Sequence, residues 1–326
     1  MRAVLCKAFG GPETLTVEEI PDPVPSAGEL RIAVAAAGVN FADILMVGGS
    51  YQESPEFPFS PGLEVAGTVI DCGAGVTGFA PGDRVMAGCS NGGFAEQVVI
   101  PAHDAYPLPE AMGFDIAGGF PVAYGTAYGA LAWRADLKAG DSLLVLGAAG
   151  GVGLSAVEVG KAMGATVIAA AGGPKKGDIA REHGADHVID YRSQDLRAAM
   201  RDITGGAGCN VIFDPVGGDS FDTAVRCLAW EGRLIVIGFA SGRIPSAPAN
   251  ILLVKNCGVL GFHWGAYRRR EPERLRAAFD QLLAWCEDGR LNPHVSQTLP
   301  LDRAGEALST LRDRRATGKI VLVTAT

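Results

Sequence analysis

One glycine-rich loop constrains the fold of this chain more than any other feature. Residues 146–153 read Leu-Gly-Ala-Ala-Gly-Gly-Val-Gly; they follow the apolar run Leu143–Leu146 and open the helical pattern of Gly151–Met163. In a strand, loop and helix of this kind, small residues let the backbone approach a pyrophosphate, and the first N–H groups of the helix hold its charge. The loop therefore predicts a dinucleotide site in a parallel sheet.

The segments after this loop alternate between strand and helix patterns. We predict strands at Thr166–Ala171, His187–Ile189, Val211–Phe213 and Arg233–Ile237, with helices at Lys175–His183, Asp195–Ile203 and Ser220–Leu228. Such alternation indicates βαβ units, in which helices cover both faces of a parallel sheet. A further apolar run, Gly258–Phe262, is expected to form an edge strand.

The two ends of the chain have a different pattern. About the first 120 residues contain short β-rich runs separated by turn signals such as Pro61-Gly62 and Pro81-Gly82-Asp83. The tail predicts helices at about Pro272–Glu287 and Leu301–Asp313 and a last strand at Ile320–Val323. A length of 326 residues suits two domains, so we expect the sheet domain to be inserted between a β-rich module and its returning tail.

Composition excludes several classes of function. The net charge of −8 argues against a broad basic surface for nucleic acid. The start of the chain, Met1–Lys7, has no secretory apolar stretch, and the uncharged run Ser142–Val157 is shorter than the ~20 apolar residues that a membrane span needs. Seven cysteines without a CxxC pair suggest neither disulfides nor a thiolate zinc site. We expect a cytoplasmic protein with no nucleic-acid or membrane partner.

The end of the second predicted strand indicates which dinucleotide binds. NAD sites place an acidic residue about 20 residues after the glycine loop, where it bonds the ribose hydroxyls. Here Gly172 and Gly173 follow the strand, and Lys175 and Lys176 come next. Glycine leaves room for a 2′-phosphate and lysine offers it a positive charge, which favours NADPH. The alternative is that both lysines belong to the solvated first turn of a helix.

Three other motifs match a functional pattern but lack its structural context. Gly73–Gly78 fits a glycine-loop pattern, yet turn residues follow it instead of a helix. Ser90 stands in a GxSxG pattern that a strand follows, which argues against a hydrolase. His183 and His187 have the spacing of zinc ligands, but Gly184 interrupts the helix between them.

The motifs together resemble the medium-chain dehydrogenase/reductase superfamily, and within it the zinc-free NADPH:quinone oxidoreductase, or zeta-crystallin-like, family. The segments that carry the resemblance are Ala37–Asp43, Pro61–Gly67, Gly93–Glu96, Tyr124–Tyr128, Ala148–Gly153, Gly184–Tyr191, Asp214–Gly217 and Thr317–Lys319. The resemblance implies an α/β fold, with a Rossmann doubly wound parallel sheet (122–262) inserted into a β-rich GroES-like catalytic domain (1–121 and 263–326). It also implies a homodimer, which we expect to form through the edge of the Rossmann sheet because an exposed edge strand is a liability.

The superfamily also contains zinc alcohol dehydrogenases, so the ligand positions of those enzymes matter. Asn40, Leu63 and Ala123 stand where they carry cysteine, histidine and cysteine. Only Gly88–Gly93 stands in place of their cysteine-rich structural zinc lobe. Leucine and alanine cannot bind zinc, so we expect no metal.

The resemblance also assigns residues to the cofactor. Lys176 and Tyr191 would flank the 2′-phosphate beside Gly172, and Asn40 and Thr126 would lie near the nicotinamide ribose. The complete expected cofactor-binding set is Asn40, Thr126, Ala149, Gly150, Gly151, Val152, Gly172, Lys176, Tyr191, Phe239, Ala240, Phe262, Trp264 and Lys319.

The expected acceptor is a small electrophile, either a quinone or an activated carbon–carbon double bond. Hydride addition to either develops negative charge on an oxygen atom, which a nearby N–H or O–H group would stabilise. We expect Asn40 and Tyr51 to serve as these catalytic donors. Some quinone reductases carry two tyrosines in this loop, and the chain has Leu45 at the first position. A non-catalytic NADPH-binding protein is the alternative of another class.

Overall fold

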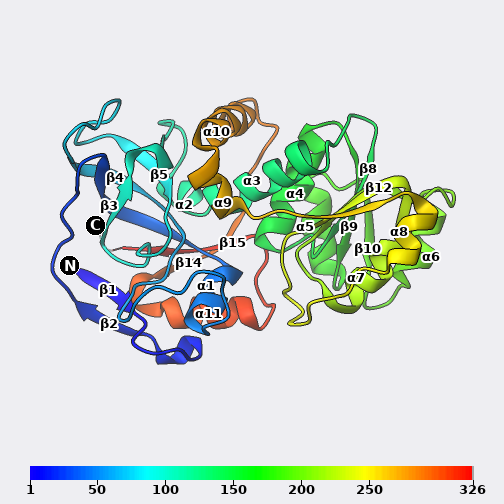
Figure 1. Ribbon diagram of the computed structural model, residues 1–326, viewed down its shortest axis with the longest axis horizontal. Helices are drawn as coiled ribbons and strands as arrows, with labels where there is room; N and C mark the ends of the chain where they lie inside the picture. Colours follow the sequence, from blue (N-terminus) through cyan, green and yellow to red (C-terminus); the bar gives the residue numbers. More distant parts are fainter. Residues whose placement is uncertain (325–326) are drawn as a thin grey trace. The chain divides into compact units, whose positions relative to one another are not determined.

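A computed structural model describes residues 1–324, and their contacts group them into two compact units. Unit 1 comprises residues 1–122, 267–276 and the described chain from Pro293 onward, and unit 2 comprises residues 123–266 and 277–292. Figure 1 labels those of their helices and strands for which there is room. The division falls within three helices, α3 (Pro121–Tyr128), α9 (Trp264–Arg270) and α10 (Pro272–Glu287).

Unit 1 is built on a seven-stranded sheet of order β14-β15-β3-β4-β5-β7, with β6 pairing β3 off this path. Alternate residues of β3 are buried from Leu30 to Val34, so one face of the strand enters the core. Two short strands, β1 and β2, form a separate antiparallel pair. The strands and helices are β1 (Arg2–Leu5), β2 (Thr16–Glu19), β3 (Glu29–Val39), α1 (Phe41–Val47), β4 (Glu64–Cys72), β5 (Arg84–Gly88), β6 (Gln97–Pro101), β7 (Ala105–Pro107), α2 (Phe114–Gly118), β14 (Val295–Pro300), α11 (Ala304–Arg312) and β15 (Lys319–Val323).

Unit 2 contains a six-stranded sheet of order β10-β9-β8-β11-β12-β13, in which every pairing is parallel. This is the doubly wound order: successive strands are added on one side of β8 up to β10 and on its other side from β11 onward. The predicted α/β fold with a parallel sheet is confirmed. The elements are η3 (Gly129–Arg134), a π-helical turn, β8 (Ser142–Leu146), α4 (Gly151–Ala162), β9 (Thr166–Ala171), α5 (Pro174–Glu182), β10 (His187–Asp190), α6 (Leu196–Ile203), β11 (Cys209–Asp214), α7 (Gly218–Ala224), η4 (Val225–Cys227), β12 (Leu228–Val236), α8 (Ala249–Lys255) and β13 (Gly258–Gly261).

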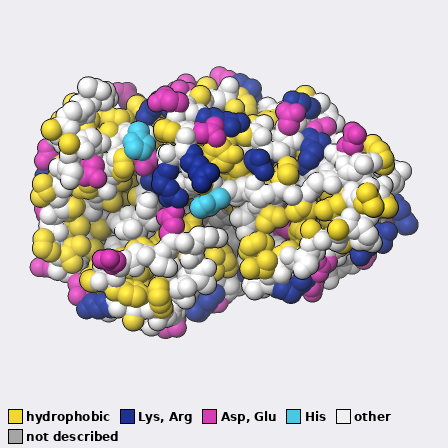
Figure 2. All heavy atoms as spheres, viewed as in Figure 1, with side chains coloured by type: hydrophobic (Ala, Val, Ile, Leu, Met, Phe, Trp, Pro, Cys, Tyr) yellow, Lys and Arg dark blue, Asp and Glu magenta, His cyan; other side chains and the backbone are white. Residues whose placement is uncertain are grey.

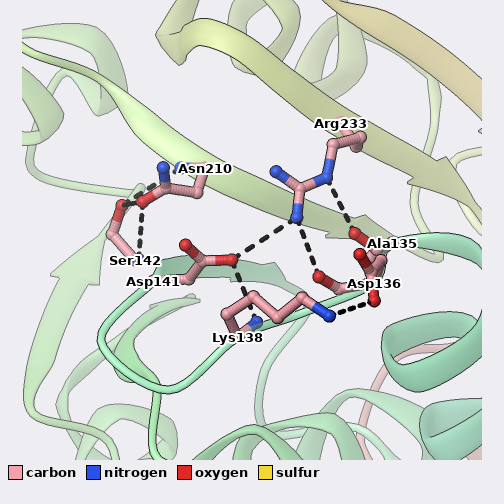
Figure 3. A network of polar contacts seen from close by, with 7 residues as sticks. All are labelled: Ala135, Asp136, Lys138, Asp141, Ser142, Asn210 and Arg233. Atoms are coloured by element: carbon pink, nitrogen blue, oxygen red, sulfur yellow. Dashed lines mark hydrogen bonds and ion pairs between the residues drawn. The ribbon is translucent and has the colours of Figure 1, made fainter.

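Polar contacts join neighbouring strands at the amino ends of this sheet. Asn210 at the start of β11 accepts hydrogen bonds from the backbone and hydroxyl of Ser142, both at 2.9 Å. The guanidinium of Arg233 donates to the carbonyl of Ala135 at 2.7 Å and reaches Asp141 at 3.4 Å, as Figure 3 shows. These bonds connect the strands at the amino edge of the sheet. Nucleotides bind such sheets at the opposite, carboxyl edge, where the strand order reverses.

The tail divides differently from the expected domain boundaries. Residues 277–292, expected in the catalytic domain, pack within unit 2. The physical reason is the apolar face of α10, on which Phe279 and Leu282 are fully buried. Trp285 on the same helix contacts the ring of Tyr128, with 5.8 Å between the ring centroids. Among the residues described, no helix combines the length and apolar character needed to cross a membrane.

Candidate functional site

The loop after β8 is shaped for close approach to the start of α4. Gly147 has a φ of +60°, and a Cβ on Gly153 would overlap the Gly147 carbonyl oxygen. The N-cap residue of α4 is Gly150, and no side chain caps the helix. The first N–H groups of a helix lack partners in the preceding turn. The N–H of Gly150 donates to the carbonyl of Gly147 at 3.0 Å, so the N–H groups of Ala149, Gly151 and Val152 are the ones that can receive a pyrophosphate.

The loop after β11 lies next to the glycine loop, where the strand order of the sheet reverses. Asp214 at the end of β11 accepts hydrogen bonds from the N–H groups of Val216 (2.8 Å) and Gly217 (2.9 Å). Burial raises the pKa of Asp214. A Cβ on Gly147 would lie 3.2 Å from Cγ2 of Val216. Asp214 thus holds the turn that places Val216 against the glycine loop.

Phe239 and Ala240 lie in the loop that follows β12. The N–H of Ala240 donates to the carbonyl of Pro215 at 3.1 Å. A Cβ on Gly217 would lie 3.0 Å from Cδ1 of Phe239. The two loops after β11 and β12 therefore brace each other at the carboxyl edge of the sheet, where the sequence predicts the nicotinamide end of the cofactor.

The end of β9 carries the geometry that discriminates between nucleotides. A Cβ on Gly172 would lie 2.7 Å from the Tyr191 hydroxyl and 3.1 Å from Nε of Arg192. Asp190 points its carboxylate at the backbone, accepting from the N–H groups of Gly173 at 2.8 Å and Arg192 at 3.0 Å. These backbone hydrogen bonds lower the pKa of Asp190, and the bond from Gly173 has the larger effect.

Gly172, Tyr191 and Lys176 were expected together, and Arg192 was not. Lys176 lies in the first turn of α5 and is partly exposed. Arg192 directly follows Tyr191 in the sequence, and that adjacency was the available signal. A guanidinium pairs with phosphate through a planar fork of N–H groups, so Arg192 belongs with the phosphate candidates.

Phe262 and Trp264 are both buried inside unit 2. A Cβ on Gly129 would overlap Cζ of Phe262, and a Cβ on Gly125 would overlap Nε1 of Trp264. The two aromatic side chains thus pack closely on the chain of α3 and η3, which gives them a structural role within the unit. Thr126, also expected near the cofactor, lies buried in α3.

Unit 1 contains a buried cluster of Asn40, Glu64 and Lys319. Nζ of Lys319 lies 2.7 Å from Oε1 of Glu64, 2.7 Å from Oδ1 of Asn40 and 3.0 Å from the carbonyl of Val39. Nδ2 of Asn40 donates to Glu64 at 2.9 Å and to the carbonyl of Gly38 at 3.3 Å. The structure therefore brings Asn40 and Lys319 together, and Glu64, which the sequence left unassigned, joins them.

The donor set at this cluster does not fit a zinc ion. Leu63 packs in an apolar cluster with Met46 and Phe59, and the oxygen atoms of Asn40 and Glu64 face the Lys319 ammonium group. Zinc prefers thiolate and imidazole ligands. Within residues 1–324 no group of three or more His, Cys, Asp or Glu side chains is arranged to hold a metal ion.

Tyr51 is partly buried on an apolar surface of unit 1. Its ring packs against the apolar cluster that contains Cys6, Met46 and Leu63. Burial, with a smaller effect from the carboxylate of Glu53, raises the pKa of the Tyr51 phenol. The phenol therefore keeps its proton at neutral pH and can donate a hydrogen bond.

Asp43 is fully buried beside this region. Its carboxylate accepts hydrogen bonds from the N–H groups of Asn40 (2.8 Å) and Gly62 (3.1 Å). Burial raises its pKa from 3.8 to about 7. Asp43 connects the start of α1 to the turn before β4, so it positions Asn40 through the backbone.

The raised pKa of Asp43 predicts a pH-dependent stability. The folded chain holds the Asp43 proton more tightly than the unfolded chain between pH 3.8 and about 7. Stability should therefore fall as pH rises through this range, by up to about 4 kcal/mol. Urea unfolding at pH 5 and pH 8 should show a smaller fall for Asp43→Asn than for the unsubstituted chain. Equal falls would contradict the assignment, even though Asp214 contributes in the same direction.

Comparisons with known proteins give the family. Residues 26–110 match the alcohol dehydrogenase GroES-like domain and residues 151–285 match the zinc-binding dehydrogenase family. The quinone oxidoreductase-like protein 2 homolog of Nematostella vectensis is 41% identical over 99% of this chain and 89% of its own. The chain belongs to the quinone oxidoreductase-like family of the medium-chain dehydrogenase/reductase superfamily.

Two further relatives of this family agree. Quinone oxidoreductase-like protein 2 of Bos taurus is 39% identical over 98% of this chain and 92% of its own. The crystal structure of Escherichia coli quinone oxidoreductase complexed with NADPH superposes with a TM-score of 0.94, at 31% identity, and covers 99% of this chain and 100% of its own. Family membership makes the chain an oxidoreductase and confirms the predicted resemblance.

Proposed function

We propose that this NADPH-dependent oxidoreductase transfers a hydride to a quinone and does so without zinc. The environment of Gly172 carries the cofactor assignment. A glycine stands where an NAD site needs an acidic side chain, and the Tyr191 hydroxyl and Arg192 guanidinium lie beside it. The E. coli relative, a quinone oxidoreductase solved with NADPH, supports the same cofactor and the same acceptor class.

The chain's own residues bind, orient and protect the reactants. When bound, the reduced nicotinamide supplies the hydride. The glycine loop holds the pyrophosphate, and Lys176, Tyr191 and Arg192 bind the 2′-phosphate. Phe239 and Ala240 flank the nicotinamide end. Such positioning accounts for much of the rate of a reaction that needs no metal.

We propose that Tyr51, and not Asn40, is the catalytic donor. Asn40 commits both N–H groups of its amide to Glu64 and Gly38, and Lys319 commits its ammonium to three oxygen atoms. Neither side chain retains an N–H group for a developing oxyanion. We therefore assign Asn40, Glu64 and Lys319 to positioning the loop before α1, and Tyr51 to the catalytic hydrogen bond.

Replacing Tyr51 with phenylalanine tests this assignment. Without the phenol, kcat with an enone or a quinone should fall at least about tenfold, because a hydrogen bond to a charged oxygen contributes about 1.5–3 kcal/mol. The KM for NADPH should stay within about twofold. Tyr128→Phe is the matched control, since it also removes one partly buried phenol hydroxyl and the Tyr128 ring packs on Trp133. An unchanged kcat for Tyr51→Phe would reject the catalytic role.

The acceptor class is tested by NADPH oxidation with a panel of quinones, enones, acrylates and enoyl thioesters. A quinone should give the highest kcat/KM. Leu45 stands at the first of the two loop positions where some quinone reductases carry tyrosine, and this favours reduction of an activated double bond as the second candidate function. A higher kcat/KM for an enone or enoyl thioester would establish that alternative. Absence of turnover with every acceptor, despite NADPH binding, would favour a non-catalytic NADPH-binding protein.

We also propose a cytoplasmic homodimer joined through β13. This strand is the last in the six-stranded sheet, and within the described chain it pairs only with β12. An exposed strand edge is a ready site for pairing with a second copy. Analytical ultracentrifugation should give the mass of a dimer, and a monomer at micromolar concentration would contradict the proposal.

A further inference from the structure

Unit 2 has a cavity of about 510 Å³ at the amino ends of β11 and β12. It lies between α6, η4 and the end of α8. Met200, Cys227 and Leu228, which line it, are buried apolar side chains. The volume falls in the range of about 300–1,000 Å³ that small-molecule sites occupy.

The charged side chains that line this cavity are mostly basic. They are Arg197, Arg201, Arg226 and Lys255, against the single carboxylate of Asp195. Oδ1 of Asp195 accepts a hydrogen bond at 2.7 Å from the N–H of Ala198, as the N-cap of α6. Figure 2 shows dark-blue side chains over the end of the molecule that Figure 1 labels α6 and α8. Four cations gathered at one cavity contrast with a chain whose net charge is −8.

Carboxylates of the chain do little to neutralise these cations. Nζ of Lys255 donates to the carbonyl oxygens of Arg226 (2.7 Å) and Leu228 (2.6 Å), which are uncharged. Arg201 reaches Asp202 at 3.9 Å, and both side chains are exposed, so this contact contributes little. Across residues 1–324, the guanidinium groups of Arg197 and Arg226 form no ion pair.

The spacing of the arginines adds to this imbalance. Arg197 and Arg201 are four residues apart on α6, so they lie on one face of the helix and repel each other. An anion bound between the two arginines would attract both of them and so offset that repulsion. Guanidinium groups suit phosphate because two parallel N–H groups meet two oxygen atoms.

We propose that this cavity binds a small multivalent anion of the phosphate or polyphosphate class. Arg197 and Arg226 would be its main partners, and Arg201 would add a third positive charge. The site is distinct from the dinucleotide site. The glycine loop lies at the carboxyl edge of the parallel sheet, whereas this cavity lies at the amino edge, next to the first residues of β11 and β12.

Isothermal titration of the full chain with tripolyphosphate tests the proposal. Saturating NADPH is present so that the dinucleotide loop does not capture the probe. Binding should be close to one per chain. Arg197→Gln/Arg226→Gln should weaken it at least about tenfold, because two charge-assisted hydrogen-bonding groups are lost. These side chains are exposed, so the variant should fold normally, which its thermal unfolding checks.

The control variant Arg181→Gln/Arg290→Gln removes two exposed arginines from the same unit and changes the net charge equally. It should bind tripolyphosphate within about twofold of the unsubstituted chain. No binding to the unsubstituted chain, or equal losses in both double variants, would overturn the proposal.

Discussion

Replacing Lys319 with methionine should destabilise the chain by about 3–5 kcal/mol, the usual loss when one member of a buried ion pair is removed. Glu64 is fully buried and Lys319 is 6% exposed. Without the ammonium group, the donors that residues 1–324 leave to the Glu64 carboxylate are neutral: Nδ2 of Asn40 at 2.9 Å and the N–H of Val122 at 2.7 Å. The free energy of unfolding in urea gives the loss directly.

An exposed ion pair supplies the matched control. Lys161 pairs with Asp186 at 2.5 Å, and the Lys161 side chain is 47% exposed. Lys161→Met should cost no more than about 1 kcal/mol, as is usual for surface pairs. Lys319→Met/Glu64→Gln should recover part of the loss, because no unpaired charge remains in the core. Equal losses for the two single variants would show that the Lys319 pair is no stronger than a surface contact.

Lys319 also shows where sequence reasoning stops. The family resemblance of the segment Thr317–Lys319 predicted that Lys319 lies near the cofactor. Its partners, Asn40 and Glu64, lie more than two hundred residues earlier. The antiparallel pairings of β15 with β3 and of β3 with β4 bring these residues together. No local pattern encodes those pairings, so the ionic cluster was not predictable from spacing.

The elements that the sequence predicted well are those with a strong local signal. The strand Thr166–Ala171 and the helix Pro272–Glu287 have the predicted bounds, because apolar periodicity is clear there and turn residues border both segments. By contrast, β14 was missed, since only Leu299 of its residues Val295–Pro300 is buried and the segment carries little apolar alternation. The helix α1 was missed because seven residues give too short a pattern.

The candidate site divides in the same way. The glycine loop and the Gly172 position follow from local order along the chain, so their residues could be named in advance. Arg192 was not named, because its proximity to Gly172 depends on the parallel pairing of β10 with β9, and its adjacency to Tyr191 was a weak signal by itself. That pairing places the residues after one strand beside the residues after its neighbour.

This arrangement at the end of β9 predicts a large and selective effect of Lys176→Ala. Loss of a charged partner of the 2′-phosphate should lower kcat/KM for NADPH by about 10- to 100-fold, mostly through KM. The value for NADH should change less than about twofold, because NADH has no 2′-phosphate. Steady-state kinetics with both nucleotides and one acceptor measures the difference. Equal effects on NADPH and NADH would reject the assignment of Lys176.

Arg192→Ala should act in the same direction, and Lys175→Ala is the matched control. Lys175 is exposed in the same turn of α5, so its removal changes the net charge equally. If the phosphate merely responds to overall positive charge, the three variants should weaken NADPH binding alike. If Lys176 and Arg192 contact the phosphate directly, Lys175→Ala should change NADPH binding by less than about twofold. This small effect should disappear in 0.5 M salt, because salt screens distant charges more than it weakens direct contacts.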